Sequence, residues 1–138
     1  MKMGLISDTH GYLDSKIFHY TEECDEIWHA GDIGNVSVLS KLENFKPLRA
    51  VFGNIDSQEI RLRTSEIAFI SCGGMNIIMT HIAGKPPSYT KKIRTQLLAN
   101  QPDIIVCGHS HILKVKFDKK TKSYIQIPVQ QVGIHFIK

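Results

Sequence analysis

The sequence lacks the features that mark several classes of protein. It has only three cysteines, which are far apart and form no Cys-x-x-Cys pair, so we expect reduced, buried thiols in a cytoplasmic protein. No run approaches the roughly 20 apolar residues of a membrane span. The N-terminal apolar run turns polar at Ser7, which is too early for a signal peptide. No repeat, linker or low-complexity segment is visible.

The excess of positive over negative charge is also small. The chain has 17 Lys and Arg residues against 13 Asp and Glu residues, which gives a net charge of +4. This excess is compatible with an anionic substrate but gives no strong signal for nucleic acid binding. The composition, 42% apolar and 22% charged, is ordinary for a globular protein. The chain of 138 residues is predicted to form a single domain, 1–138, with a substantial core.

The first third of the chain alternates between strand and helix patterns. Strands are predicted at residues 3–7, 25–30 and 48–52. Between them, a helix spans 14–23, and a second helix begins at Asn35 and stops before Pro47. This alternation favours a parallel, buried sheet.

Hairpin signals appear in the remainder. Strands at 66–72 and 76–80 are joined through Gly73 and Gly74, and a second hairpin joins 112–117 to 123–128. Between the hairpins we expect a strand at 103–107, preceded by a helix at 89–100 whose inward residues are Ile93, Leu97 and Leu98. The predicted fold class is α/β, a layered α-β-β-α sandwich of two mixed sheets.

Polar side chains follow five of the predicted strands at the point where each strand ends. They are Asp8 and His10, Asp32, Asn54, His81, and His109 with His111. Ligands of α/β sheets bind beyond the carboxyl ends of the strands. These side chains therefore converge if the strands lie side by side.

The convergent residue types suit a metal centre. Carboxylate, imidazole and amide oxygen together suit borderline divalent ions. Seven ligands are too many for one tetrahedral ion, but they suit two ions that share one carboxylate at a separation of roughly 3.5–4 Å. The glycines before Asp32, Asn54 and His109 let the backbone turn sharply.

Each of these signals alone has an ordinary structural explanation. A Gly-Asp or Gly-Asn pair is more often a turn than a ligand, and a lone histidine is more often packed or solvated. It is the five together, each at the end of a strand, that favour a metal site. His19, His29 and His135 fall outside the pattern and are assigned no role.

The same motifs resemble the metallophosphoesterase (calcineurin-like phosphoesterase) superfamily. They are Asp8-x-His10, Gly31-Asp32, Gly53-Asn54-x-Asp56, His81 and Gly108-His109-x-His111. The small prokaryotic phosphodiesterases of that superfamily, related to the retromer subunit of the same fold, are the most similar in size. The resemblance implies that Asp8, His10 and His111 hold one ion, that Asn54, His81 and His109 hold the other, and that Asp32 bridges them. It implies two divalent ions, most naturally Mn²⁺, with Fe, Zn, Ni, Co or Mg as alternatives.

The resemblance also implies a reaction. A metal-bridging hydroxide would attack phosphorus in line, without a covalent intermediate, and Asp32, Asn54, Asp56 and His109 would be the catalytic residues. Ile55 stands where many family members carry a histidine that acts as general acid, and Ile55 cannot donate a proton. Aryl phosphodiesters are therefore expected to react faster than esters with poor leaving groups.

Two other interpretations stay open. A catalytically weak interaction scaffold of the same fold would be free to lose ligands, whereas all seven positions are filled here. A mononuclear metal protein would bind one ion per chain. The partners we expect are a small phosphodiester substrate and further copies of the chain, with no membrane.

The C-terminal tail departs from the family pattern. Small members continue into an Asn-Pro-Gly segment and further strands, whereas residues 126–138 read QIPVQQVGIHFIK. Permissible codons for this tail encode Asn-Pro-Gly in another frame, so we suspect a frameshifted remnant. The expectation is that the C-terminal strands are truncated and leave a sheet edge exposed.

Overall fold

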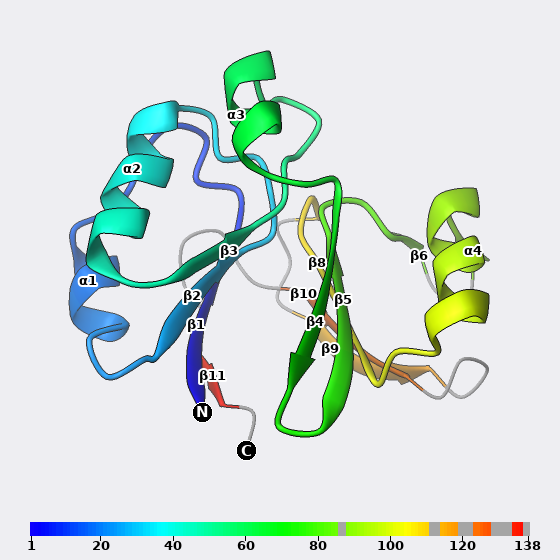
Figure 1. The fold of residues 1–138 in the computed structure, drawn as a ribbon. Helices are drawn as coiled ribbons and strands as arrows, with labels where there is room; N and C mark the ends of the chain where they lie inside the picture. Colours follow the sequence, from blue (N-terminus) through cyan, green and yellow to red (C-terminus); the bar gives the residue numbers. More distant parts are fainter. Residues whose placement is uncertain (86–87, 111–113, 119–122, 128–133, 137–138) are drawn as a thin grey trace.

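The computed structural model describes residues 1–85, 88–110, 114–118, 123–127 and 134–136. Two sheets lie face to face, and helices cover their outer faces (Figure 1). The α-β-β-α sandwich of two mixed sheets that the sequence predicts is therefore confirmed.

The first sheet has four strands. In spatial order they are β11 (Ile134–Phe136), β1 (Lys2–Ile6), β2 (Glu26–His29) and β3 (Leu48–Ala50). β1, β2 and β3 are parallel, as the alternation of strand and helix predicts. Because they run in one direction, their carboxyl ends meet at one end of the sandwich.

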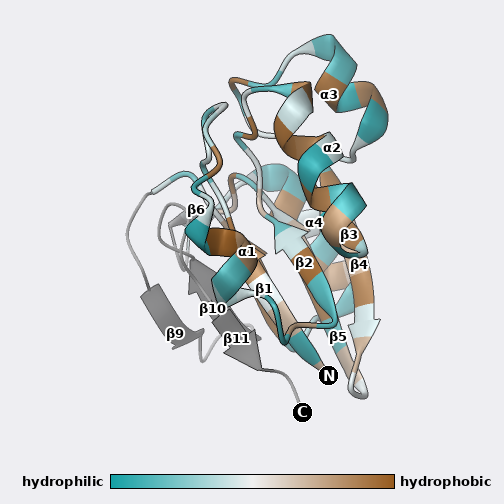
Figure 2. Ribbon diagram, turned by 90° about the vertical axis from the view of Figure 1, so that its left-hand side faces the viewer, coloured by the Kyte–Doolittle hydropathy of each residue, from teal (hydrophilic) through white to brown (hydrophobic). Residues whose placement is uncertain are grey.

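Three helices accompany this sheet: α1 (Lys16–Tyr20), α2 (Val36–Phe45) and α3 (Gln58–Arg63). α2 begins as predicted, because the Asn35 side chain accepts a hydrogen bond from the Ser37 N–H at 2.8 Å. The helix predicted at 14–23 is wrong in its bounds, since α1 has only 5 residues. Brown and teal residues alternate along α2 and α3 in Figure 2, as expected for helices that bury one face.

The second sheet has five strands and is mixed. In spatial order they are β4 (Ile67–Cys72), β5 (Met75–Thr80), β8 (Ile104–Cys107), β10 (Ser123–Ile127) and β9 (Lys114–Asp118). β4 pairs antiparallel with β5, and β9 with β10, so both predicted hairpins are present. β5 and β10 pair parallel with β8. A short pair, β6 (Gly84–Lys85) and β7 (Ser88–Tyr89), precedes α4 (Lys91–Asn100) on the outer face (Figure 1).

Alternation along the strands divides the core into layers. Met3 and Leu5 of β1 face the second sheet and pack in one cluster with Ile77 and Met79 of β5. Ile6 faces the opposite way and packs with α1 and α2. A further cluster lies between the second sheet and α4. The two faces of β1 are thus buried by different layers, and a shift of one residue would exchange them, so burial fixes the register of this strand.

The tail contributes a strand that the sequence analysis did not predict. β11 pairs antiparallel with β1, with Met3 opposite His135. β11 thus covers one edge of β1. The expectation that C-terminal strands are truncated and leave a sheet edge exposed named no strand, and it stays a prediction. The suspected frameshifted remnant is the tail 126–138, of which residues 128–133 and 137–138 lie outside the described residues, so the frameshift stays a prediction.

The buried face of α4 differs from the prediction at one residue. Ile93 and Leu97 are 1% and 8% exposed and pack against the sheet, whereas Leu98 is 83% exposed. Positions 93 and 97 are four residues apart and share one helix face, while position 98 is turned by about 100°. The prediction that Leu98 faces inward is wrong.

This geometry predicts unequal effects of truncating the two neighbouring leucines. Leu97→Ala should lower the free energy of unfolding by about 2–4 kcal/mol, because it leaves a cavity beneath α4. Leu98→Ala should change it by no more than about 0.5 kcal/mol. Urea denaturation of both variants measures this difference, and equal losses would contradict the placement of α4.

Candidate metal centre

The loops that follow β1 and β2 lie side by side at one end of the sandwich. The Asp8 N–H donates to the Gly31 carbonyl at 2.9 Å, and the His10 N–H donates to the Asp32 carbonyl at 3.0 Å. Farther along, the Gly108 N–H donates to the carbonyl of His81 at 3.0 Å. Backbone hydrogen bonds therefore tie together the loops that the sequence analysis expects to converge.

Two groups of candidate ligands meet in this region. One contains Asp8, His10 and Asp32, and the other contains Asp32, His81 and His109. Within each group, one ligand atom from each residue lies within 4.8 Å of the others. Asp32 belongs to both groups, which is the place that the sequence analysis gives to the bridging carboxylate.

The orientation of His81 shows that the centre fits a cation. Its Nδ1–H donates to the Ala30 carbonyl at 2.7 Å, so Nε2 is the ring nitrogen that remains to bind an ion. Nε2 is buried and has no hydrogen-bond partner. It lies 3.2 Å from Oδ2 of Asp32 and 3.7 Å from Oδ1 of Asp8. One imidazole nitrogen and two carboxylates, buried together, are donors that suit a divalent ion.

Some of the candidate ligands are buried and others are exposed to solvent. Asp8, Asp32 and His81 are buried, whereas His109 is exposed and the His10 side chain is 36% exposed. The His109 ring lies edge-on to His81 with a centroid distance of 5.3 Å. Histidines on the open side leave room for a water or substrate beside a bound ion, as catalytic metal sites require.

Two further predicted ligands, Asn54 and His111, are not members of the two ligand groups. Asn54 is exposed and lines a pocket together with His81. His111 lies outside the described residues. The assignment of the seven ligands to two ions stays a prediction.

Unusual backbone conformations coincide with the ligands. Asp8, His10, Asp32 and His109 have φ values of 55°, 49°, 55° and 72°. Among the described residues, the one other non-glycine residue with positive φ is Gln101, the C-cap of α4. Residues other than glycine rarely adopt this region, and such strain is typical of functional sites.

Gly53 lets the third strand approach the centre. A Cβ atom at Gly53 would overlap the carboxylate and the backbone nitrogen of Asp32. A side chain here would displace the residue that the two ligand groups share. The glycine before Asn54 therefore permits close approach as well as a turn.

Asp56 holds the backbone around the centre. Its carboxylate accepts hydrogen bonds from the N–H groups of Ile33, Gly34 and Gly53 at 3.1, 2.8 and 2.8 Å. These contacts join the loop after β2 to the loop after β3. The catalytic role of Asp56 stays a prediction, and the structure gives it this positioning role in addition.

His29, to which the sequence analysis assigns no role, lies beneath the ligand loops. Its Nδ1 accepts from the Gly31 N–H at 3.1 Å, so Nε2 carries the proton and donates to the Thr9 hydroxyl at 3.0 Å. Thr9 in turn donates to the Ile33 carbonyl at 2.9 Å. This chain joins the two loops that carry Asp8, His10 and Asp32. An imidazole at the end of a buried strand, directly before a ligand turn, is the signal that could have identified it.

Burial also keeps the His29 ring neutral, as these hydrogen bonds require. His29 is fully buried, and this burial lowers its pKa from 6.5 to about 4, although the Asp56 and Asp8 carboxylates partly oppose the shift. His29 is therefore neutral at pH 7. A protonated ring would lose the hydrogen bond from Gly31, because Nδ1 could no longer accept.

Family comparison agrees with this geometry. The model of the calcineurin-like phosphoesterase superfamily domain matches residues 1–126. The chain therefore belongs to the calcineurin-like phosphoesterase superfamily, as the motifs indicate.

Individual relatives support the same conclusion. A probable metallophosphoesterase of Methanothermobacter thermautotrophicus is 27% identical over 116 residues, which cover 80% of this chain and 67% of the relative. A phosphodiesterase of Methanocaldococcus jannaschii is 22% identical over 128 residues, covering 80% of this chain and 74% of that protein. The Vps29 crystal structure from Chaetomium thermophilum shares the fold, with a TM-score of 0.77 and 11% identity over 94% of this chain and 71% of that one.

Two simpler expectations can also be compared with the structure. All three cysteines are free and buried, as predicted. Burial raises the pKa of the Cys107 thiol to about 12. Within the described segments, no helix has the length and apolar character needed to cross a membrane.

The buried His29 predicts a specific dependence of stability on pH. Its pKa is lower in the folded chain than in the unfolded chain, so the unfolded chain binds the proton more readily. The stability that the neutral His29 ring contributes is complete above pH 6.5, and about 3 kcal/mol of it is lost as the pH falls toward 4. The unfolding free energy of the wild type minus that of His29→Asn, measured in chelator, should shrink by this amount between pH 7 and pH 4. A difference that does not change with pH would contradict the buried neutral state.

Proposed function

We propose that the chain is a phosphodiesterase that uses two divalent metal ions, most naturally Mn²⁺. Asp8, His10 and His111 would hold one ion, Asn54, His81 and His109 the other, and Asp32 both. When bound, such ions activate a water molecule for attack on phosphorus and neutralise phosphoryl oxygens. The free, buried cysteines fit a reducing compartment, so a cytoplasmic location is part of the proposal.

The single observation that carries this proposal is the position of Asp32. Its carboxylate belongs to both ligand groups and lies 3.5 Å from Nε2 of His10 and 3.2 Å from Nε2 of His81. One carboxylate between two imidazoles supports a centre of two ions rather than one.

The charge of the donor set supports an anionic substrate. Only Asp8 and Asp32 are carboxylates, and the other proposed ligands are neutral imidazoles and the amide of Asn54. Two dications would therefore keep a net positive charge. A phosphodiester carries a single negative charge, which this centre would attract.

The residue that follows Asn54 cannot protonate the leaving group. This residue, Ile55, is 47% exposed and has no proton to donate. The Ile55 N–H donates instead to Oδ1 of Asp32 at 3.2 Å. Ile55 thus contacts the shared carboxylate through its backbone, while its apolar side chain is partly exposed to solvent.

The proposal predicts activity that requires both metal and Asp32. Metal-stripped protein should not hydrolyse bis(p-nitrophenyl) phosphate, and added Mn²⁺ should restore hydrolysis. Asp32→Ala should lower kcat/KM by more than about 100-fold, because loss of a partner that merely orients a ligand already costs about 10–100-fold. Initial rates of nitrophenolate release measure both effects.

Asp103→Asn is the matched control. Asp103 lies at the opposite end of β8, where its carboxylate accepts from the Asn76 N–H at 2.8 Å, and an asparagine oxygen can do the same. This variant should keep wild-type activity. If Asp32→Ala retained Mn²⁺-dependent activity as Asp103→Asn does, the proposed centre would be wrong.

Ile55 predicts a dependence on the leaving group. General acid catalysis is worth about 10²–10⁴-fold when the leaving group is a poor one. Bis(p-nitrophenyl) phosphate should therefore react at least about 100-fold faster than an alkyl phosphomonoester. Comparison of kcat/KM for the two substrates measures this, and equal rates would reveal a proton donor at another position.

A second candidate function is an interaction scaffold with little catalysis. The apolar, exposed Ile55 directly after Asn54 and the similarity to the Vps29 fold favour it. Two bound ions per chain without turnover of any phosphoester would support the scaffold, whereas metal-dependent turnover would exclude it.

A further inference from the structure

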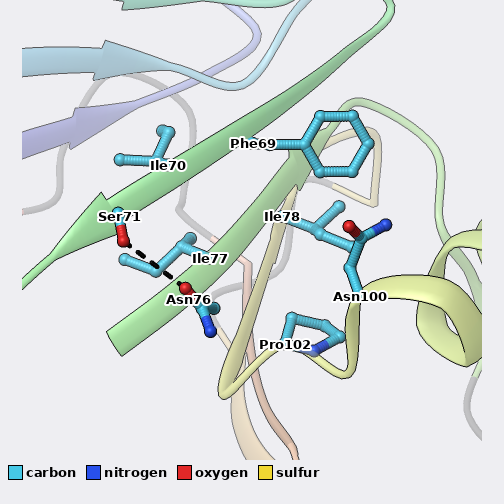
Figure 3. Close-up of a pocket in the computed structure, with 8 residues that line it drawn as sticks. All are labelled: Phe69, Ile70, Ser71, Asn76, Ile77, Ile78, Asn100 and Pro102. Carbon is cyan, nitrogen blue, oxygen red and sulfur yellow. Dashed lines mark hydrogen bonds between the residues drawn. The ribbon is translucent and has the colours of Figure 1, made fainter. Parts of the chain in front are cut away.

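Two of the hollows on the described surface differ in their chemistry. One lies on the outer face of β4 and β5, between Phe69 and Pro102 (Figure 3). Its lining holds no acidic, basic or histidine side chain, so nothing there recognises a charged ligand. The other has a volume of about 280 Å³ and is lined by Asn54 and His81, two of the proposed metal ligands.

Arg61 forms part of the wall of this second hollow. Its Nε donates to the Asp56 carbonyl at 2.8 Å, and Nη2 lies 3.4 Å from the carbonyls of Gly53 and Asn54. The guanidinium also lies 4.6 Å from the centroid of the Phe52 ring. The side chain is thus fixed in place against the loop that carries Asn54.

The charge of Arg61 is not neutralised as other charges on the surface are. Arg63 of the same helix pairs with Glu43 at 2.7 Å, and Arg49 pairs with Glu26 at 2.9 Å. Within the described part of the chain, the hydrogen bonds of Arg61 go to backbone carbonyls. A guanidinium without a carboxylate partner, beside a metal centre, is suited to bind a phosphoryl oxygen.

The rest of the wall is apolar or already paired. Phe52 and Ile82 supply apolar surface, and Ile82 is 40% exposed. Glu66 also lines the hollow, but its carboxylate pairs with Lys92 at 2.7 Å. The hollow is slightly smaller than the usual pockets for small ligands, roughly 300–1,000 Å³. It therefore has room for one ring with few substituents.

We propose that this hollow, which we call the Arg61 pocket, binds one ester group of the substrate. The Arg61 pocket is lined by Phe52, Asn54, Arg61, Glu66, His81 and Ile82. A planar ring of a phosphodiester lies against Phe52 and Ile82, and Arg61 donates to a phosphoryl oxygen. This inference rests on the proposed function and adds a substrate class to it: phosphodiesters with at least one aromatic ester group.

The test compares binding of diphenyl phosphate and dimethyl phosphate to the full chain in Mn²⁺, by calorimetry. Both probes carry the same charge, and only the first carries rings. The wild type should bind diphenyl phosphate at least about tenfold more tightly, because burying one aromatic ring strengthens binding by a factor of about this size. Equal affinities would overturn the proposal.

Two variants separate the contributions of charge and ring. Arg61→Ala should weaken both probes by about tenfold or more, since a charged hydrogen bond is lost. Ile82→Trp, which fills the pocket, should weaken diphenyl phosphate alone. Arg63→Ala is the control on the same helix and should bind both probes as the wild type does.

Measuring the affinity for Mn²⁺ distinguishes a structural role of Arg61 from direct contact with the substrate. If Arg61→Ala lowered Mn²⁺ affinity as much as phosphate affinity, Arg61 would act by holding the Asn54 loop, and its proposed contact with substrate would be overturned. Because binding is measured rather than turnover, the outcomes stay distinct. Absence of hydrolysis would count against the proposed function, whereas wild-type affinity for diphenyl phosphate in Arg61→Ala and Ile82→Trp would count against the Arg61 pocket.

Discussion

The burial of two carboxylates beside one imidazole is the constraint around which this end of the molecule is organised. His81 donates from Nδ1 to the Ala30 carbonyl, so its Nε2 faces the Asp8 and Asp32 carboxylates. A fold that buries ionisable groups this close together needs strong restraints elsewhere. The structure provides them in the Asp56 carboxylate and in the hydrogen-bonded chain from Gly31 through His29 and Thr9 to Ile33.

The layers of the fold give these restraints a rigid base. Parallel strands bring their carboxyl ends to one end of the sandwich, and β1 and β2 are each held on both faces by a different core cluster. The ligands then extend from loops whose ends cannot shift independently. This agrees with a site whose buried part is fixed while His10 and His109 stay open to solvent.

The sequence predicted what depends on periodicity and on position at a strand end. Asp8, Asp32 and His81 could be proposed because each follows a recognisable strand. α3 could not be predicted, since a helix of 6 residues with one buried residue, Ile60, shows no helical period. The contacts of Arg61 with the backbone of the Asn54 loop, and the hydrogen bonds by which Asp56 joins two loops, leave no spacing pattern in the sequence. Leu98 was misplaced because adjacent leucines cannot both face the sheet from one helix.

The left-handed conformations of the ligands imply a conflict between stability and metal binding. Asp8 and Asp32 both adopt φ of 55°, a conformation that glycine adopts without steric cost and aspartate does not. A glycine at either position would relieve the backbone strain and would remove a candidate ligand in the same step. The residues at which the backbone is least comfortable are thus the ones that the two ligand groups need, so a substitution chosen for backbone comfort alone would take the site apart.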